Sequence, residues 1–296
     1  MKPVKPLLFL FALVLCSPAG FSQLIQPPVG MEFRLNSKFN PEFIRNNRIA
    51  EIRCKVESKK DGDKIRNTNR EEVYHFYENG NLKMISHINN QLRDTSITFF
   101  EYTQGRLECE VKNDAAGMFS YCYEYDKNER PITLRYGRAE RFNSLTASLD
   151  MSMSSEITAE SYEYLAYENQ LHATLRNSSG RPYLKEIRYF DENGYLEKYL
   201  KTYIIGSSRH EENYKYNARG WLSEKAISDG DNFYKLTYTY DAVGNLEEER
   251  KYIGEELKYR KEYVYNAANM FLTAELKRED ENELIVITTY TYKFQK

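Results

Sequence analysis

The sequence contains little of what most active sites require. Histidine occurs four times, at positions 75, 87, 172 and 210, and these positions show no metal-ligand spacing. No GxSxG, HExxH, P-loop or CxxC motif is present. Acidic residues such as Asp126, Asp191 and Asp241 occur singly at turns, where they bond their own backbone. We therefore expect a protein that is not an enzyme and that has no metal and no cofactor.

Two further absences narrow the choice of partners. The net charge is only −2, with acidic and basic residues interspersed, so the basic excess typical of nucleic-acid-binding proteins is missing. We expect no nucleic-acid partner. The clearest apolar run, residues 7–15, is too short for a membrane helix, so no integral membrane segment is expected in the mature chain. The charge run at residues 247–251 would also interrupt the apolar band of a transmembrane barrel.

The short apolar run belongs to an export signal. Lys2 and Lys5 precede it, and Gly20 and Ser22 occupy the −3 and −1 positions if cleavage follows residue 22. Residues 1–22 are therefore predicted to be a signal peptide, and the mature protein to be secreted, periplasmic or on the cell surface. A lipid anchor on Cys16 is the less favoured alternative, because the residue before it is a leucine where lipoprotein processing requires a small side chain.

Cysteine is scarce as well. Three cysteines follow residue 22, at positions 54, 109 and 122, so at most one disulfide can form. Cys109 and Cys122 flank a turn at residues 113–117. Strict alternation along the two strands places Cys109 and Tyr123 on one face and Cys122 on the other. We therefore expect three unpaired thiols.

Tyrosine, in contrast, is abundant, with 26 residues against a single tryptophan. Its flat ring with a polar tip suits a half-buried pleated surface, so the composition favours strands. Many tyrosines belong to a repeat of an aromatic-x-aromatic pair, a short turn, a Gly or Asn, one variable residue and a large aliphatic residue. The clearest copies are Tyr214, Tyr216, Asn217, Gly220, Leu222; Tyr238, Tyr240, Asp241, Gly244, Leu246; and Tyr263, Tyr265, Asn266, Asn269, Leu272.

The Gly or Asn residues, here called anchors, show the period of the repeat. They lie at positions 80, 105, 169, 194, 220, 244 and 269, with separations of 25, 64, 25, 26, 24 and 25 residues. The gap of 64 contains an insertion and one degenerate copy, with Glu129 and Arg130 at the turn. The aromatic pair lies on one face of a strand, and the anchor supplies a turn with positive φ, which Gly adopts best and Asn tolerates. Each unit is therefore predicted to be a β-hairpin.

The most regular copy contains Tyr238, Tyr240, Asp241, Gly244, Asn245 and Leu246. In this order it resembles the YD repeat of the RHS and teneurin class of secreted or cell-surface proteins, and the resemblance covers about residues 71 to 296. It implies a spiral of strands, which in long arrays closes into a shell, often around a toxin domain. This chain has only about eight or nine units and no recognisable toxin region, so we expect an all-β, open, curved and twisted sheet of antiparallel hairpins.

Three regions are expected along the chain. Residues 1–22 form the signal peptide, residues 23–42 form a linker that contains Pro27 and Pro28, and residues 43–296 form the repeat domain. An insertion at residues 138–160 is rich in Ser, Thr and Met. Long loops of this kind are either mobile or functional.

These features favour an exported, non-enzymatic scaffold that presents a repeat surface to a protein or glycan of the cell envelope. Aromatic side chains are frequent interface anchors, and their flat rings also suit the faces of sugars. Trp221 follows Gly220, and alternation places its ring on the face opposite Leu222, which makes it the aromatic residue that we most expect to be exposed. The candidate binding residues are Trp221, Tyr214, Tyr216, Tyr238, Tyr240, Tyr263 and Tyr265.

Two alternatives stay open at this point. The tyrosines and Trp221 could serve only to pack one strand against the next, since cross-strand aromatic pairs stabilise sheets. The protein could also be an enzyme of unrecognised type with its site in the insertion at residues 138–160.

Overall fold

The computed structural model describes residues 23–25, 38–92, 94–139, 142–143, 148–149, 155–206, 208–281 and 283–296. The predicted signal peptide, residues 1–22, lies outside the described residues. Within them, one helix, α1 (Pro41–Asn46), precedes the strands. The strands are β1 (Ile49–Lys60), β2 (Arg66–Phe76), β3 (Leu82–Asn89), β4 (Asp94–Thr103), β5 (Arg106–Asp114), β6 (Gly117–Tyr125), β7 (Pro131–Arg138), β8 (Phe142–Asn143), β9 (Ser148–Leu149), β10 (Ser155–Ala166), β11 (Gln170–Arg176), β12 (Pro182–Phe190), β13 (Leu196–Tyr203), β14 (Arg209–Tyr216), β15 (Leu222–Asp229), β16 (Asn232–Tyr240), β17 (Leu246–Ile253), β18 (Glu256–Tyr265), β19 (Leu272–Glu279) and β20 (Leu284–Phe294).

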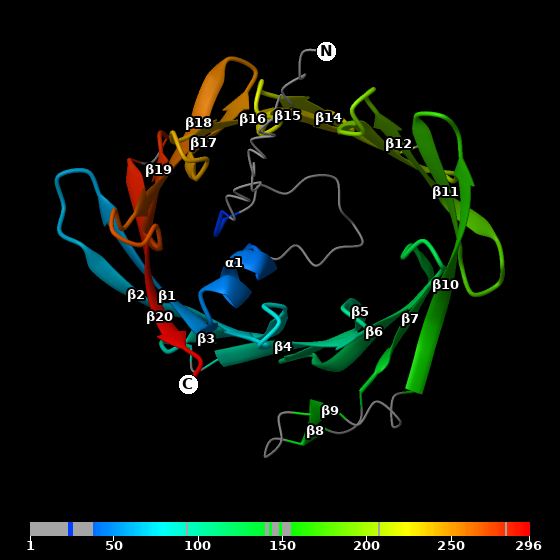
Figure 1. Ribbon diagram of the computed structural model, residues 1–296, viewed down its shortest axis with the longest axis horizontal. Coiled ribbons are helices and arrows are strands. Elements are labelled where there is room, and N and C mark those ends of the chain that lie inside the picture. The colour runs from blue at the N-terminus through cyan, green and yellow to red at the C-terminus, as the bar shows by residue number, and fades with distance from the viewer. Residues whose placement is uncertain are drawn as a thin grey trace, which may run out of the picture.

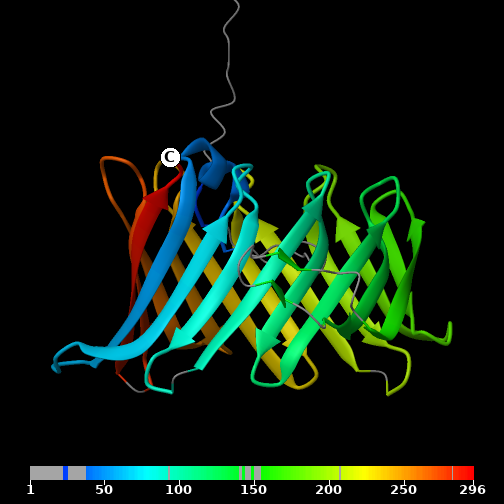
Figure 2. The same ribbon diagram turned by 90° about the horizontal axis from the view of Figure 1, so that it is seen from below.

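Eighteen strands of the described ranges form one closed antiparallel barrel. Each of them pairs with its neighbours along the chain, β7 pairs with β10, and β1 pairs with both β2 and β20. Figure 1 looks through the resulting ring, and Figure 2 shows the barrel from the side. The first and last strands join over a long register, from Ile49 opposite Phe294 to Lys60 opposite Leu284.

The expected open sheet is therefore wrong, whereas the expected all-β, antiparallel character is found. An open array would leave backbone groups of β1 and β20 without ladder partners at its two edges. Pairing these strands with each other removes both edges at once. A barrel widens as strands are added, so one of this size encloses more space than its own side chains fill.

The described N-terminal residues, 23–25 and 38–46, lie in the interior at one end of the barrel. α1 lies inside the ring in Figure 1, and the Asn40 side chain caps it by accepting a hydrogen bond from the backbone of the first turn. Leu24 and Phe39 are almost completely buried, and the Phe39 ring meets Tyr74 of β2 edge to face at 4.9 Å. Described residues of the expected linker thus pack in the interior, and the expected domain boundary at residue 43 falls within α1.

An ion pair ties this N-terminal segment to the barrel wall. Lys38 Nζ lies 3.1 Å from Glu275 Oε2 on β19 and donates a hydrogen bond to the Tyr290 hydroxyl on β20. Tyr290 in turn donates to Glu275 at 3.0 Å. Burial alone would raise the pKa of Glu275, but Lys38 and Lys261 more than offset this and hold it below the ordinary value. The carboxylate therefore stays charged at neutral pH inside the barrel.

The anchors lie at the hairpin turns, as their period predicts. Gly220, between β14 and β15, has a φ of 77°, and Gly244, between β16 and β17, has a φ of 100°. Asp241 Oδ1 accepts hydrogen bonds from two backbone N–H groups of its turn, at 3.0 and 2.8 Å. An Asp or Asn at this position holds the turn, and the anchor supplies the positive φ. In the degenerate copy Glu129 takes the same conformation, with a φ of 62°.

The expectation that Asn replaces Gly at the positive-φ position is wrong for both Asn269 and Asn169. The turn between β18 and β19 is one residue longer than the turn between β16 and β17. Its left-handed residue is Met270, with a φ of 58°. The turn between β10 and β11 is short, and neither Asn169 nor a neighbour of it has a positive φ among the described residues.

A β-bulge follows the large aliphatic residue of most hairpins. In the β4–β5 hairpin Tyr102 is opposite Leu107, and Glu101 is opposite Cys109, so Glu108 has no partner of its own. Equivalent register shifts occur at the same place in the hairpins β2–β3, β6–β7, β12–β13, β14–β15, β16–β17 and β18–β19. The extra residue reverses the face of every residue that follows it on the strand.

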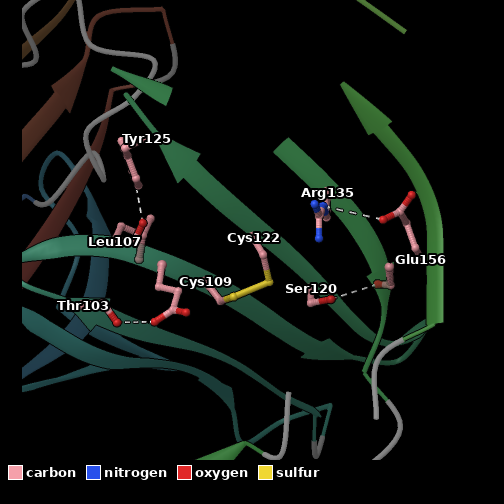
Figure 3. The surroundings of a disulfide bond; sticks show 10 residues. Thr103, Leu107, Cys109, Ser120, Cys122, Tyr125, Arg135 and Glu156 are labelled. Atoms are coloured by element: carbon pink, nitrogen blue, oxygen red, sulfur yellow. Dashed lines mark hydrogen bonds and ion pairs between the residues drawn. A yellow bond between two sulfur atoms is a disulfide. The ribbon is translucent and has the colours of Figure 1, made fainter. Parts of the chain in front are cut away.

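This reversal explains why Cys109 and Cys122 are bonded. Leu107 faces the interior, and after the bulge Cys109 faces outward, directly opposite Cys122 on β6. The two cysteines form a disulfide, which Figure 3 shows. The expectation of three unpaired thiols is therefore wrong, because it assumed unbroken alternation from Leu107 onward. Cys54 is free, and its burial raises the pKa of the thiol to about 12.

About half of the predicted insertion, residues 138–139, 142–143, 148–149 and 155–160, lies in the described ranges. Residues 155–160 already belong to β10 and pair with β7. β8 and β9 pair with each other and lie outside the ring, next to β5 and β6 in Figure 1 and in front of this wall in Figure 2. Residues 140–141, 144–147 and 150–154 lie outside the described residues.

Candidate binding site on the anchor rim

The turns that carry the anchors form one end of the barrel, here called the anchor rim. It comprises the turns of the hairpins β2–β3, β4–β5, β6–β7, β10–β11, β12–β13, β14–β15, β16–β17 and β18–β19, and it is the end at which α1 lies (Figure 2). Every repeat contributes a turn to this rim, so equivalent side chains of neighbouring repeats come close together here.

The second tyrosine of six pairs links neighbouring hairpins at this rim. Its hydroxyl donates a hydrogen bond to the backbone carbonyl of the residue that ends the turn in the preceding hairpin. The bonds are Tyr125 to Leu107 (2.7 Å), Tyr164 to Pro131 (2.9 Å), Tyr216 to Leu196 (2.8 Å), Tyr240 to Leu222 (2.7 Å), Tyr265 to Leu246 (2.9 Å) and Tyr292 to Leu272 (2.7 Å). Tyr216, Tyr240 and Tyr265 therefore have a structural task, whatever else they do.

The first tyrosine of each pair lies deeper in the interior. Tyr214, Tyr238 and Tyr263 are exposed by only 3%, 4% and 8%, and they belong to the core that includes the N-terminal segment. Burial raises the pKa of Tyr238 and Tyr263, so both stay protonated. The structure thus brings the sequence-predicted tyrosines together along the inner wall, and it does not bring them together as an exposed patch.

Trp221 is half-buried, whereas the sequence led us to expect an exposed ring. Its ring lies over Gly244 of the next turn, where a Cβ would approach Trp221 Cζ2 to 2.7 Å. The ring centroid lies 5.2 Å from that of Tyr240, and the Arg219 guanidinium lies 5.0 Å from the ring. Trp221 therefore packs one hairpin against the next, which is the simpler of the two roles considered for it.

An aromatic residue that the sequence argument missed is more exposed than Trp221. Tyr195 occupies the same slot in the preceding hairpin, directly after Gly194, and 40% of its surface is exposed. Its ring centroid lies 4.9 Å from that of Tyr216. The variable position directly after the anchor, which Trp221 also occupies, could have identified Tyr195 from the sequence. The β12–β13 copy was passed over because it has only one aromatic residue in common with the regular C-terminal copies.

Tyr195 borders a recess between the hairpins β12–β13 and β14–β15, here called the Tyr195 recess. Its volume is about 730 Å³, within the range of small-molecule sites. The residues that give it chemical character are Asp191, Asn193, Tyr195, Glu197, Tyr216 and Arg219. The recess thus combines an exposed aromatic ring with carboxylates, a carboxamide and a guanidinium.

The polar groups of this recess are held by the turns themselves. Asp191 Oδ1 accepts the backbone N–H groups of Asn193 and Tyr195, both at 2.9 Å. Burial raises the pKa of Tyr216 to about 12, and the Asp191 carboxylate contributes to the rise, so the phenol stays protonated. Arg219 donates to the Ala242 carbonyl of the next turn at 3.1 Å. Such fixed planar groups can hydrogen-bond a polar ligand whose apolar face lies on the tyrosine ring.

Nucleophiles, metal ligands or membrane helices would indicate other kinds of site. The lining of the Tyr195 recess, as described, contains no histidine, cysteine, serine or threonine. The described residues hold no group of three or more His, Cys, Asp or Glu side chains placed to ligate a metal ion. None of the helical residues described forms a segment long and apolar enough to cross a membrane.

No protein-family model and no curated protein matches the sequence. Among solved structures, the chain is similar to a porin-like protein from Bacteroides uniformis, with 11% identity and a TM-score of 0.38 over 83% of this chain and 98% of that one. It is also similar to the Photorhabdus luminescens Tc holotoxin pore, with 10% identity and a TM-score of 0.27 over 75% of this chain and 15% of that one. A third likeness is to a putative outer membrane lipoprotein-sorting protein domain from Vibrio parahaemolyticus, with 11% identity and a TM-score of 0.18 over 86% of this chain and 91% of that one. All three likenesses are distant, and the strand pairing alone establishes the closed barrel.

Proposed function

We propose that this chain is an exported, non-catalytic β-barrel of the YD-repeat type, which binds a protein or glycan of the cell envelope at the Tyr195 recess. The observation that carries the proposal is the exposed Tyr195 ring beside fixed polar groups. Like Trp221, Tyr195 packs against the next hairpin, but 40% of its surface stays exposed. Exposed tyrosine rings with polar neighbours are frequent in binding surfaces.

The cysteines support the exported location. Disulfides form and persist in oxidising compartments, and they are rare in the reducing cytosol. The Cys109–Cys122 bond is consistent with export and agrees with the predicted signal peptide. Disulfide formation after export would therefore lock two neighbouring strands of the barrel.

The outer wall supports a barrel that stands in water. On β17 and β18, several of the residues that face away from the interior tyrosines are charged and paired. Glu248 forms ion pairs with Arg250 and Arg260, and Arg260 also pairs with Glu262. Charged residues on the lipid face of a transmembrane barrel cost about 2–4 kcal/mol each for Arg at the bilayer midplane. We infer that this wall faces solvent and that the rim is the surface offered to partners.

A binding screen with one matched pair of variants tests this proposal. The exported protein is screened against glycans and proteins of the cell envelope, and each hit is measured again with Tyr195→Ala and with Tyr167→Ala. Tyr167 is also an exposed rim tyrosine, at 57%, but it does not line the recess. We expect Tyr195→Ala to weaken binding about tenfold or more, as truncation of an aromatic anchor does, and Tyr167→Ala to leave it unchanged.

Because Tyr195 also packs against Tyr216, a second variant separates binding from stability. Asn193 is an exposed turn residue whose side chain lines the recess, so Asn193→Ala is expected to weaken binding while the melting temperature stays the same. Equal affinities for the wild type, Tyr195→Ala and Asn193→Ala would refute the recess as the binding site.

A further inference from the structure

A second recess lies on the anchor rim at an equivalent position of the repeat. It is found between the hairpins β2–β3 and β4–β5, is here called the Tyr77 recess, and also has a volume of about 730 Å³. Its lining consists of Tyr77, Glu78 and Asn79 from the first hairpin and Glu101, Tyr102 and Glu108 from the second. The rings of Tyr77 and Tyr102 meet edge to face at 6.0 Å, so an aromatic pair borders this recess too.

The two recesses share their turn sequence. The tripeptide Glu-Asn-Gly occurs twice in the chain, at residues 78–80 and 192–194, and each copy forms the turn of the hairpin that begins a recess. Asn79 and Asn193 are both exposed, and both line their recess. The second tyrosine of the following hairpin, Tyr102 or Tyr216, lies on the other side. The rim therefore presents an exposed asparagine beside a tyrosine ring in two places.

The two linings differ in net charge. The Tyr195 recess balances Asp191 and Glu197 against Lys215 and Arg219. The lining of the Tyr77 recess includes three carboxylates, and Lys83 Nζ lies beside it, 5.6 Å from the centroid of the Tyr77 ring. A ligand that enters both recesses must therefore be neutral or cationic, since like charges across an interface are unfavourable.

The positions of the recesses imply a long or repetitive ligand. Eight strands separate them around the ring, from β4 to β13. At about 4.8 Å per strand, roughly 40 Å of rim lies between the two. Two sites this far apart that share an asparagine and a tyrosine ring favour a ligand that repeats the same chemical unit, because the second binding event then becomes intramolecular.

We infer that the two recesses are equivalent subsites for a polysaccharide that carries amino sugars. This inference rests on the proposed function and names its ligand class. Asparagine and carboxylate groups hydrogen-bond sugar hydroxyls, the tyrosine rings cover the apolar face of a sugar ring, and the carboxylates attract the ammonium group. Basic peptides would also satisfy the charge and could hydrogen-bond the carboxamides, so the test includes an oligolysine peptide.

Calorimetric titration of the exported protein with a glucosamine hexamer tests the inference. We expect two hexamers to bind per barrel. The variant Glu78→Gln/Glu101→Gln is expected to lose one of the two sites, and Asn193→Ala to weaken the other. The control variant Glu192→Gln/Glu247→Gln removes two exposed carboxylates that line neither recess, and it is expected to keep both sites. Chitosan, as the long polymer, should bind about 10²-fold more weakly once either recess is lost.

The outcomes separate this inference from the proposed function. Binding of one hexamer that Tyr195→Ala weakens and Glu78→Gln/Glu101→Gln leaves unchanged would overturn the second subsite and leave the proposed function intact. Binding of an oligolysine peptide in place of the hexamer would overturn the glycan assignment and indicate a basic protein segment. Hexamer binding that no variant of either recess weakens would overturn both the inference and the proposed function.

Discussion

The contact between α1 and the β2–β3 turn can be tested by adding a single Cβ atom at Gly80. Gly80 has a φ of 87°, and a Cβ at this position would lie 2.8 Å from the Pro41 carbonyl carbon and 3.0 Å from Arg45 N. Real Cβ atoms do not approach backbone so closely, so Gly80→Ala must displace α1. Gly194 is the matched control: it lies in the same Glu-Asn-Gly turn, has a φ of 81°, and its Cβ would meet nothing within 4 Å.

The magnitudes of the two substitutions follow from these distances. The left-handed conformation costs alanine about 1–2 kcal/mol, and both variants bear this cost. Gly80→Ala also unseats α1, whose buried side chains Phe43 and Ile44 contribute about 1.5–3 kcal/mol each. The two variants should therefore differ by about 3 kcal/mol or more. For a domain of this size we expect Gly194→Ala to melt about 2–6 °C lower and Gly80→Ala to melt at least about 6 °C lower still.

Thermal unfolding followed by circular dichroism measures both variants, and limited proteolysis of residues 38–48 reports on α1 directly. Gly80→Ala should expose this segment to cleavage, whereas Gly194→Ala should not. Equal melting temperatures for the two variants, with equal resistance to cleavage, would show that α1 does not rest on the β2–β3 turn and would refute the contact inferred at Gly80.

Two further predictions concern cross-links between parts of the barrel. Reduction of the Cys109–Cys122 disulfide should lower the free energy of unfolding by about 3 kcal/mol, because the bond closes a short loop with a sequence separation of 13 residues; an unchanged denaturation midpoint after reduction, against a Cys54→Ala control, would contradict this. Lys38→Met should destabilise the protein by about 2 kcal/mol at pH 7, since it deprives the buried Glu275 carboxylate of a partner. The pKa of Glu275 is held below its ordinary value of 4.5 in the folded state, so the ion pair contributes its stability above that pH and loses it as the pH falls through the lower folded pKa. The difference in unfolding free energy between wild type and variant should therefore shrink below pH 4.5. A difference that is constant from pH 7 to pH 3 would refute the pairing.

The local part of the fold was predictable from the sequence because it depends on short-range chemistry. Asp241 and Gly244 specify a turn whatever the rest of the chain does, since one accepts backbone hydrogen bonds and the other adopts positive φ. The tyrosine pairs specify a strand with one half-buried face. Hairpins at the regular anchors follow from these two signals, and the structure confirms them.

The closure of the barrel was not predictable in the same way. It depends on β1 and β20, which are more than 200 residues apart and carry no special residue that announces their pairing. Whether an array of this length closes depends on the small twist and stagger between neighbouring strands, summed over the whole ring. A repeat count alone contains neither quantity.

The disulfide was missed for a different reason. Side-chain alternation is a reliable rule only within an unbroken ladder, and the bulge at Glu108 breaks it between Leu107 and Cys109. No Gly or Pro marks residue 108, so the sequence offers no local sign of the bulge. Once one hairpin is known, however, the shared register shift after the aliphatic residue transfers to the other copies.

The candidate site was located only in part, because the same aromatic residues that suggest binding also hold the repeats together. In a closed ring every hairpin has two neighbours, so a second tyrosine can find a carbonyl partner in the preceding hairpin, as Tyr240 does in Leu222. In the regular copies, therefore, the aromatic residues are the ones most engaged in packing and hydrogen bonds within the barrel. Exposed groups remain where a copy departs from the pattern, as the Glu-Asn-Gly turns beside Tyr77 and Tyr195 do. In this barrel the irregular repeats, rather than the regular ones, are thus the places to seek a ligand.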